Sequence, residues 1–165
     1  MIEAAAATAD EVGLGHLTLA AVAQRLGVRQ PSLYKYVDGV ADLRHSVGVR
    51  AAHELNGVLV RATAGRAGSD AIRSLSRSYR EWAHLHPATY QASQTAATAF
   101  DVISTVLGSY DLGAEETIDA ARATRSTLHG FLSLENQRAF GRGVDIDRSF
   151  ERLVHGLIVA LDDRP

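Results

Sequence analysis

The stretch Thr18-Leu-Ala-Ala-Val-Ala-Gln-Arg-Leu-Gly-Val-Arg-Gln-Pro-Ser-Leu-Tyr-Lys-Tyr-Val37 predicts two short helices joined by a tight turn. Thr18 can accept a hydrogen bond from a first-turn amide, so we expect it to cap a helix over 19–26. Gly27 follows, where a left-handed residue releases the chain without a Cβ penalty. Pro31 lacks an N–H and suits the first position of a second helix, predicted over 31–37. The segment therefore predicts a helix-turn-helix.

The second predicted helix has one apolar and one polar face. Leu33 and Val37 lie four residues apart, so we expect both to face the interior. The outward face is then small, aromatic and basic, and consists of Pro31, Ser32, Tyr34, Lys35 and Tyr36.

Charge is concentrated locally on this motif. The chain carries 17 basic and 19 acidic residues, a net charge of −2, which argues against a protein that coats nucleic acid through bulk basicity. Between Gln24 and Val37, however, Arg25, Arg29 and Lys35 occur without any acidic residue. A specific DNA-binding protein needs only such a local positive patch.

Composition indicates a helical, cytoplasmic protein. With 165 residues, 46% of them hydrophobic, and only three prolines, the chain can bury a substantial core. It contains no cysteine, which excludes disulfides and thiolate metal sites. The N-terminal residues lack a basic leader segment and no apolar run reaches membrane-spanning length, so we expect neither export nor membrane insertion.

The rest of the chain shows helical periodicity without a strand pattern. We therefore predict an all-α fold of about nine helices, divided into a three-helix head over 1–45 and a helical body over 46–165. Besides 19–26 and 31–37, the expected helices cover 2–12, a long segment capped by Asp38 and ending near 62, 69–85, 87–93, 94–107, 114–135, and a last helix capped by Asp145 or Asp147 and ending near 161.

The stretch 17–37, together with Leu43, resembles the DNA-binding head of the tetracycline-repressor (TetR) family of transcriptional regulators. The body resembles the ligand-binding half of a subgroup with a WHG-type C-terminal domain, in Tyr79-Arg-Glu-Trp-Ala-His-Leu-His-Pro87 and Leu128-His-Gly-Phe-Leu-Ser-Leu-Glu135. The resemblance implies a homodimeric repressor that binds a palindromic operator through its two heads and is released from it by a small molecule.

By this resemblance, Gln30, Pro31, Ser32 and Lys35 would face base edges. Thr18, Tyr34 and Tyr36 would contact backbone phosphates, and Arg29 would add positive charge. The chemistry of these side chains is suitable, because Gln30 offers the donor and acceptor that adenine requires and Lys35 can address guanine. Hydroxyl groups such as that of Thr18 can donate to phosphate.

Two features differ from the family pattern. Ala20 and Val40 stand where many members have a basic residue, and the basic extension that usually precedes the first helix is missing before Ile2. Each loss removes a phosphate contact, so we expect weaker DNA binding with a shallower salt dependence. The alternative hypothesis is a helical small-molecule-binding protein whose DNA-binding head has been weakened or lost.

An effector site needs a mostly apolar cavity with a few polar groups. The alternative for each candidate is burial in the core. The candidate ligand-binding residues in the body are Tyr79, Trp82, His86, Tyr90, Phe100, His129 and Phe131.

The last helix and the long helix before it carry wide apolar faces, which favour a helix-on-helix dimer interface. The alternative is burial of these faces within one chain. The predicted interface residues are Leu128, Leu132, Phe150, Leu153, Val154, Leu157, Ile158 and Leu161.

Catalysis is not expected. Glu81 and His84 have the Glu-x-x-His spacing of di-iron bundles, but such sites need a second copy that the chain lacks. We interpret Arg80, Glu81 and His84 as a solvated helix face. No His-Glu-x-x-His, Gly-x-Ser-x-Gly or phosphate-binding glycine loop occurs, so the sequence predicts no catalytic residue, metal or cofactor.

Overall fold

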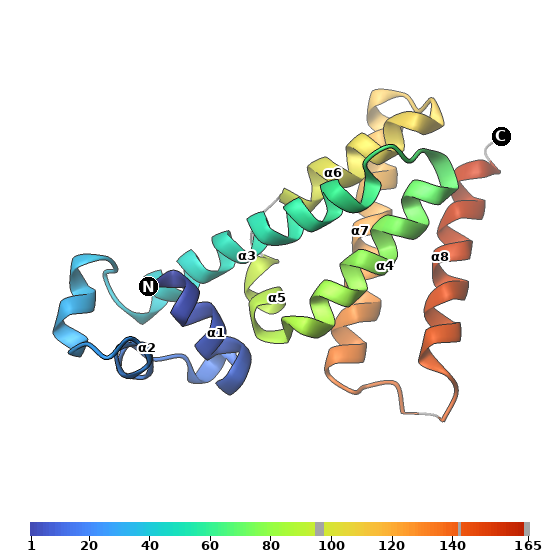
Figure 1. Ribbon diagram of the computed structural model, residues 1–165. Coiled ribbons are helices and arrows are strands. Elements are labelled where there is room, and N and C mark those ends of the chain that lie inside the picture. The colour runs from blue at the N-terminus through green and yellow to red at the C-terminus, as the bar shows by residue number, and fades with distance from the viewer. Residues whose placement is uncertain (95–97, 142, 164–165) are drawn as a thin grey trace. The chain divides into compact units, whose positions relative to one another are not determined.

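The computed structural model describes residues 1–94, 98–141 and 143–163, and these residues are helical without a strand (Figure 1). This confirms the predicted all-α class. The eight α-helices of the described residues, together with one six-residue 3-10 helix in the head, correspond to the nine predicted helices. They are α1 (Ile2–Val12), α2 (Leu19–Leu26), the 3-10 helix η2 (Gln30–Lys35), α3 (Val40–Thr63), α4 (Gly68–Leu85), α5 (Pro87–Ser93), α6 (Thr98–Leu107), α7 (Ala114–Asn136) and α8 (Ile146–Asp162). Two further short 3-10 turns, η1 (Leu14–His16) and η3 (Gly108–Tyr110), lie between them.

The chain forms two compact units, and each has its own core. The first unit contains Met1–Leu55 together with α5, and the second contains the rest of α3 with α4, α6, α7 and α8. The predicted head over 1–45 therefore lies within a larger packed unit that also includes α5. In this unit α1 packs against α2 and α5, and α2 packs against η2.

The core of the first unit is built from the inward faces of these short helices. Val22 of α2, Leu33 of η2 and Val47 of α3 are almost completely buried together, with small alanines of α1 on the other side. Burying a Val or Leu side chain contributes roughly 1.5–3 kcal/mol. The apolar residues that the sequence places four apart therefore hold η2 against α2 and α3.

Local signals fix the two ends of α2. The Thr18 hydroxyl accepts a hydrogen bond from the Ala21 amide at 3.2 Å, as predicted for a cap. Gly27 has a φ of 67°, and its amide donates to the carbonyls of Ala23 and Gln24. In this left-handed conformation glycine avoids the steric penalty of a Cβ. The predicted bounds of α2 are thus confirmed.

The second helix of the motif differs in type from the prediction. Residues Gln30–Lys35 form a 3-10 helix, in which the Ser32 amide donates to the Arg29 carbonyl and the Tyr36 amide donates to the Leu33 carbonyl. The turn before it ends at Arg29, one residue earlier than expected. A six-residue segment with proline at its second position has few amides available for α-type bonds, which favours the tighter 3-10 pattern.

The start of α3 also differs from the prediction. The helix begins at Val40, and the Asp38 side chain does not cap it as expected. The Asp38 amide donates to the carboxylate of Asp42 at 3.0 Å, so Asp42 is the acid that stabilises this helix start. Gly39, with a φ of 146°, makes the turn into the helix.

In the second unit, α4 lies beside α7 and α8 (Figure 1), and charged side chains join these helices. Arg77 of α4 forms a bidentate pair with Glu151 of α8, at 3.0 and 3.1 Å. Arg80 of α4 pairs with Glu135 of α7 and with Asp147 of α8. The sequence interpretation of Arg80 as part of a solvated face is therefore wrong, because its side chain is only 15% exposed.

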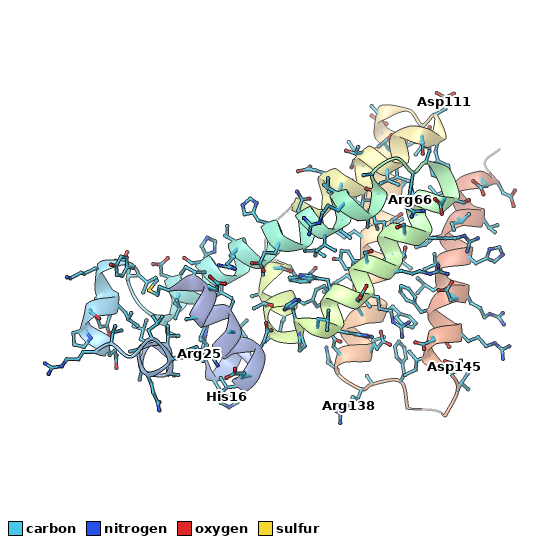
Figure 2. The ribbon with its side chains drawn as sticks, viewed as in Figure 1. His16, Arg25, Arg66, Asp111, Arg138 and Asp145 are labelled. Atoms are coloured by element: carbon cyan, nitrogen blue, oxygen red, sulfur yellow. The ribbon has the colours of Figure 1, made fainter. Side chains whose placement is uncertain are left out.

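The loop before α8 ends in a side-chain cap. Asp145, labelled in Figure 2, accepts hydrogen bonds from the amides of Asp147 and Arg148 at 2.9 and 3.4 Å. Of the two predicted caps, Asp145 is therefore the one used. The positive end of the helix dipole also stabilises a carboxylate at this position.

Candidate nucleic-acid interface

The outward face of η2 is open to solvent. Tyr34 is 55% exposed and Tyr36 is 70% exposed, whereas Leu33 and Val37 are each only 3% exposed. The aliphatic pair anchors the short helix, so the two tyrosines are held on the opposite side. Large exposed aromatic side chains are unusual on a surface without a partner, which makes this face a candidate binding surface.

All eight predicted DNA-binding residues lie in the first unit, beside α2 or on η2 with its flanking residues. Ser32 is half-buried, and its hydroxyl donates to the Arg29 carbonyl at 2.6 Å. This bond commits the Ser32 proton to the backbone and leaves the oxygen as an acceptor. The other seven side chains belong to exposed residues: Thr18, Arg29, Gln30, Pro31, Tyr34, Lys35 and Tyr36.

Positive charge in this region is distributed unevenly. Arg25, labelled in Figure 2, forms an ion pair with Glu11 of α1. Arg29 and Lys35 lie at the two ends of η2 and are exposed. A side chain that is already paired gives up that pair to bind phosphate, so Arg29 and Lys35 are better placed than Arg25 to contact an anionic partner.

A cavity of about 330 Å³ lies at the junction of α2, η2 and α3. Three predicted DNA contacts, Thr18, Gln30 and Tyr34, line it, together with Ala20 and Val40. The remaining lining residues are Leu17, Leu19, Gly39 and Arg44. None of the lining residues is acidic. The small side chains at positions 20 and 40 thus leave an opening beside the candidate interface.

The predicted effector residues are divided between the two units. His86 and Tyr90 belong to the first unit, and Tyr79, Trp82, Phe100, His129 and Phe131 belong to the second. Four of them are buried, each no more than 8% exposed, which agrees with the alternative that they are core residues: Tyr79, Trp82, Tyr90 and Phe131. The other three, His86, Phe100 and His129, are half-buried.

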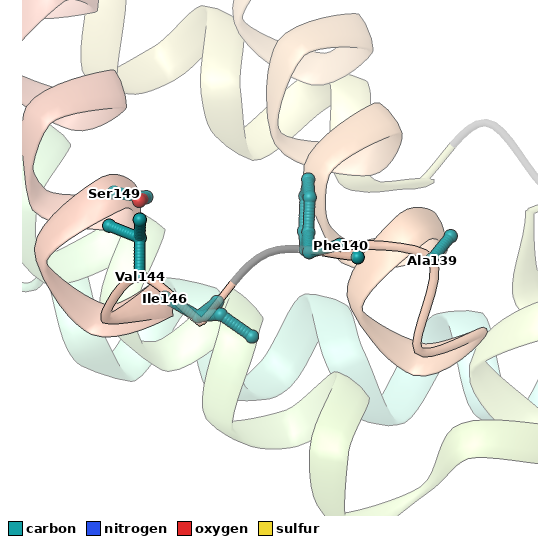
Figure 3. A pocket seen from close by; sticks show the side chains of 6 residues that line it. Ala139, Phe140, Val144, Ile146 and Ser149 are labelled. Atoms are coloured by element: carbon teal, nitrogen blue, oxygen red, sulfur yellow. The ribbon is translucent and has the colours of Figure 1, made fainter.

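Phe131 belongs to an aromatic cluster beside a second cavity. Its ring centroid lies 4.8 Å from that of Phe140 and 5.3 Å from that of Phe150. Phe140 in turn lines a cavity of about 300 Å³ at the connection between α7 and α8. Figure 3 shows this cavity with its other lining residues: Ala139, Gly141, Val144, Ile146 and Ser149.

Comparisons with known proteins agree with this arrangement. The family profile described as "Tetracyclin repressor-like, C-terminal domain" matches residues 72–157. An uncharacterized HTH-type transcriptional regulator, Rv0681 of Mycobacterium tuberculosis, is 36% identical over an alignment that covers 99% of this chain and 81% of that protein. The chain belongs to the TetR family.

Solved structures of similar proteins share the same fold. The putative regulatory protein SCO4313 has 25% sequence identity, a TM-score of 0.76, and a match that covers 95% of this chain and 92% of its own. A TetR variant from Acinetobacter baumannii AYE, solved in complex with minocycline, has 19% identity and a TM-score of 0.77, covering 98% and 93%. As a TetR-family member, the chain is a DNA-binding transcriptional regulator with a helix-turn-helix and a ligand-binding domain.

Within this TetR-family body, sequence reasoning missed an ion-pair network. Glu135 of α7 accepts hydrogen bonds from Arg80 at 3.0 and 2.5 Å and lies 2.9 Å from His84 Nε2. The guanidinium carbon of Arg80 lies 4.7 Å from the Phe150 ring centroid. Burial raises the pKa of Glu135, but hydrogen bonds and charge from Arg80 and His84 outweigh it, so the pKa is lowered overall. The Glu135 carboxylate is therefore held in its charged form.

The apolar faces predicted for dimerisation are largely covered within one chain. Leu128, Leu132, Phe150, Val154, Ile158 and Leu161 are buried, and Leu153 and Leu157 are half-buried. Large apolar side chains on the outward faces of α7 and α8 remain exposed, namely Ile118, Leu134 and Val159 at 40%, 46% and 40%. Most of the predicted interface residues therefore belong to the core of a single protomer, and the exposed apolar positions lie on other faces of these helices.

Among residues 1–94, 98–141 and 143–163, no group of three or more His, Cys, Asp or Glu residues has the arrangement to hold a metal ion. Within those ranges no helix combines the length and the apolar character needed to cross a membrane.

Proposed function

We propose that this TetR-family protein is a dimeric, cytoplasmic repressor that binds a palindromic operator and is released from it by a small molecule. Each protomer presents η2 to a major groove. Gln30, Pro31, Ser32 and Lys35 face base edges, while the hydroxyl groups of Thr18, Tyr34 and Tyr36 donate to phosphates. Arg29 supplies charge at the start of η2. Phosphate contacts position the head, and base contacts supply the sequence preference.

The observation that carries this proposal is the contrast between the two faces of η2. Leu33 and Val37 are each 3% exposed, whereas the two tyrosines between them are 55% and 70% exposed. A short, rigid element with its outer face open and basic fits the groove-reading role of a helix-turn-helix. Its anchored side also keeps the loss of side-chain entropy on binding small.

The effector site is proposed to lie in the body. Its candidates there are the half-buried Phe100 and His129 and the buried Tyr79, Trp82 and Phe131. His86 and Tyr90 are separate candidates in the first unit. Burial and the charge of Arg125 lower the pKa of His129, which favours the neutral imidazole at pH 7. A neutral ring can accept or donate a hydrogen bond to an uncharged ligand. The minocycline-bound fold relative supports a small-molecule effector.

The dimer is proposed to form through α7 and α8. Leu153 and Leu157 are half-buried, and Val159 on α8 and Leu134 on α7 are exposed enough for a second copy to cover them. Gly130 and Gly156 also lie on exposed positions of these helices, where a second helix can approach closely. Sedimentation of the purified protein tests this, with a dimer expected and a concentration-independent monomer contradicting it.

Fluorescence anisotropy tests the function itself. Labelled fragments of upstream DNA are titrated with the protein at low and at moderate salt, with a scrambled duplex as the control. The proposal predicts saturable, sequence-dependent binding that a cognate small molecule reverses. Absence of sequence-dependent binding at both salt concentrations would instead support the alternative, a small-molecule-binding protein with a lost DNA-binding head.

A further inference from the structure

We infer that the cavity between α2, η2 and α3 is a binding site for one backbone phosphate of the DNA, with Arg44 as its charged residue. This inference rests on the proposed function and adds a residue to the interface that the sequence pattern did not assign. The cavity has a volume of about 330 Å³, and Thr18, Gln30, Tyr34 and Arg44 supply its polar groups.

Arg44 is held in place by the backbone of the segment before α2. One of its terminal nitrogens, Nη2, donates to the carbonyl of Gly15 at 2.8 Å and to that of Leu17 at 3.3 Å. The guanidinium is therefore preorganised, and positioning it costs little side-chain entropy when a ligand binds. Both partners are neutral carbonyls, so the positive charge of Arg44 is not compensated by a carboxylate among the bonds that fix it.

One N–H group of Arg44 has no hydrogen-bond partner within the described part of the chain. Its Nε is buried, yet no acceptor lies within hydrogen-bonding distance. A buried donor on a charged group is costly to leave unsatisfied, and such groups call for an explanation. Because Nε is shielded from solvent, it does not contact the phosphate itself, and its unsatisfied N–H adds positive potential beside the cavity that Arg44 lines. The charge of the guanidinium suits a phosphate group that enters there.

The surroundings of Arg44 favour an anion over a neutral ligand. The first residues of α2 and α3, Leu19 and Val40, both line the cavity, so the positive ends of two helices lie beside it. The acid nearest in sequence, Asp42, has its carboxylate bound to the Asp38 amide and does not line the cavity. The hydroxyls of Thr18 and Tyr34 add neutral donors.

The small residues at the opening give the site its access. Ala20 and Val40 line the cavity, and a long basic side chain at either position would fill it. Arg44 lies one helical turn after Val40, on the same face of α3. The positive charge in the cavity lining therefore comes from Arg44 and not from position 40.

The test compares Arg44→Gln with Arg50→Gln in the full-length protein. Glutamine removes the charge and also the terminal nitrogen that donates to the carbonyls of Gly15 and Leu17, so the salt slope and not the stability alone is the readout. Arg50 is the matched control, because it also lies on α3 but pairs with Glu54 at 2.6 Å and does not line the cavity. Affinity for the operator and for a scrambled duplex is measured from about 50 to about 200 mM salt.

Loss of one phosphate contact in each head lowers the salt slope by about 0.9 per contact, hence by about 1.8 for a dimer. The affinity deficit of Arg44→Gln is then about twelvefold larger at the low-salt end of this range than at the high-salt end. The deficit is the same on operator and scrambled DNA, because a phosphate contact reads no sequence. Arg50→Gln keeps the wild-type slope.

A methylphosphonate scan locates the contact. Replacing single phosphates of the operator by neutral methylphosphonate weakens wild-type binding at each contacted phosphate. At one of these positions per half-site the same replacement has no further effect on Arg44→Gln. An Arg44→Gln protein that binds with the wild-type slope, with a lower melting temperature alone, overturns the inference and assigns Arg44 a structural role. The inference is also overturned if no methylphosphonate replacement weakens binding while inorganic phosphate shifts the Arg44 Nε–H resonance, because the site then binds free phosphate and not DNA. Wild-type protein that binds no DNA refutes the proposed function instead.

Discussion

Replacement of Gly48 by alanine tests the packing of α3 against α5 in the first unit. A Cβ built on Gly48 would lie 2.6 Å from the carbonyl oxygen of Ala92 and 3.1 Å from its carbonyl carbon. Both atoms belong to the backbone of α5, so a side-chain rotation cannot relieve the clash. The two helices must separate by several tenths of an ångström to accept the methyl group.

Gly57 on the same helix provides a matched control. A Cβ there meets only the end of the Arg61 side chain, at 3.3 Å, which can move aside. Glycine to alanine within a helix stabilises by about 0.8–1.0 kcal/mol in both cases. Overpacking costs about 1–3 kcal/mol, and only Gly48→Ala incurs it. The difference between the two variants therefore isolates the clash.

We expect Gly57→Ala to be more stable than wild type by about 1 kcal/mol and Gly48→Ala to be less stable than Gly57→Ala by about 1–3 kcal/mol. Urea unfolding followed by circular dichroism gives both free energies, and thermal scans should separate the variants by about 2–4 °C for each kcal/mol. Equal stabilisation by the two substitutions would refute the close approach of α3 and α5 at this glycine.

Two further substitutions have defined outcomes. Among the described residues, Glu135→Gln leaves Arg80, which is 15% exposed, with Asp147 as its one acidic partner. We therefore expect a loss near the lower end of the roughly 3–5 kcal/mol typical of a broken buried pair, measured by urea unfolding at pH 7. The pKa of Glu135 is lowered below its ordinary 4.5 in the folded protein, so its contribution to stability is present above that value and is lost as the pH falls through the folded pKa. The stability of Glu135→Gln should therefore vary less with pH below about 5 than that of the wild type. A variant with the same pH profile as the wild type would contradict the ion pair. Gly27→Ala places a Cβ at a φ of 67° with open space around it, so the loss should be about 1–2 kcal/mol from backbone strain alone, and a neutral result in the same assay would argue against the left-handed turn.

The sequence predicted the head well because its signals are local. The Thr18 cap, the left-handed Gly27 and the proline near the start of η2 each depend on a few neighbouring residues. The first two occur as predicted, and η2 begins one residue before Pro31. These local signals did not predict that the second helix of the motif is a 3-10 helix. Leu33 and Val37 lie inward in either an α-helix or a 3-10 helix, so their spacing does not distinguish the two over so short a segment.

The body was harder to predict because its features depend on contacts between distant segments. Arg80 and Glu135 are 55 residues apart, and only the packing of α4 on α7 brings them together. Similarly, an apolar face on α8 has the same sequence pattern whether its own chain or a second copy covers it. The structure assigns Phe150 and Val154 of this face to the interior of a single chain.

The central claim, that the outer face of η2 reads DNA, is tested most directly by operator binding of Gln30→Ala against Gln24→Ala. Both glutamines are exposed, but Gln24 lies on α2 and Gln30 begins η2. We expect Gln30→Ala to lose about 1–3 kcal/mol of affinity for the operator, while its affinity for a scrambled duplex and that of Gln24→Ala for either DNA stay at wild-type values. Equal operator affinity of the two variants would contradict a role of this face in reading DNA.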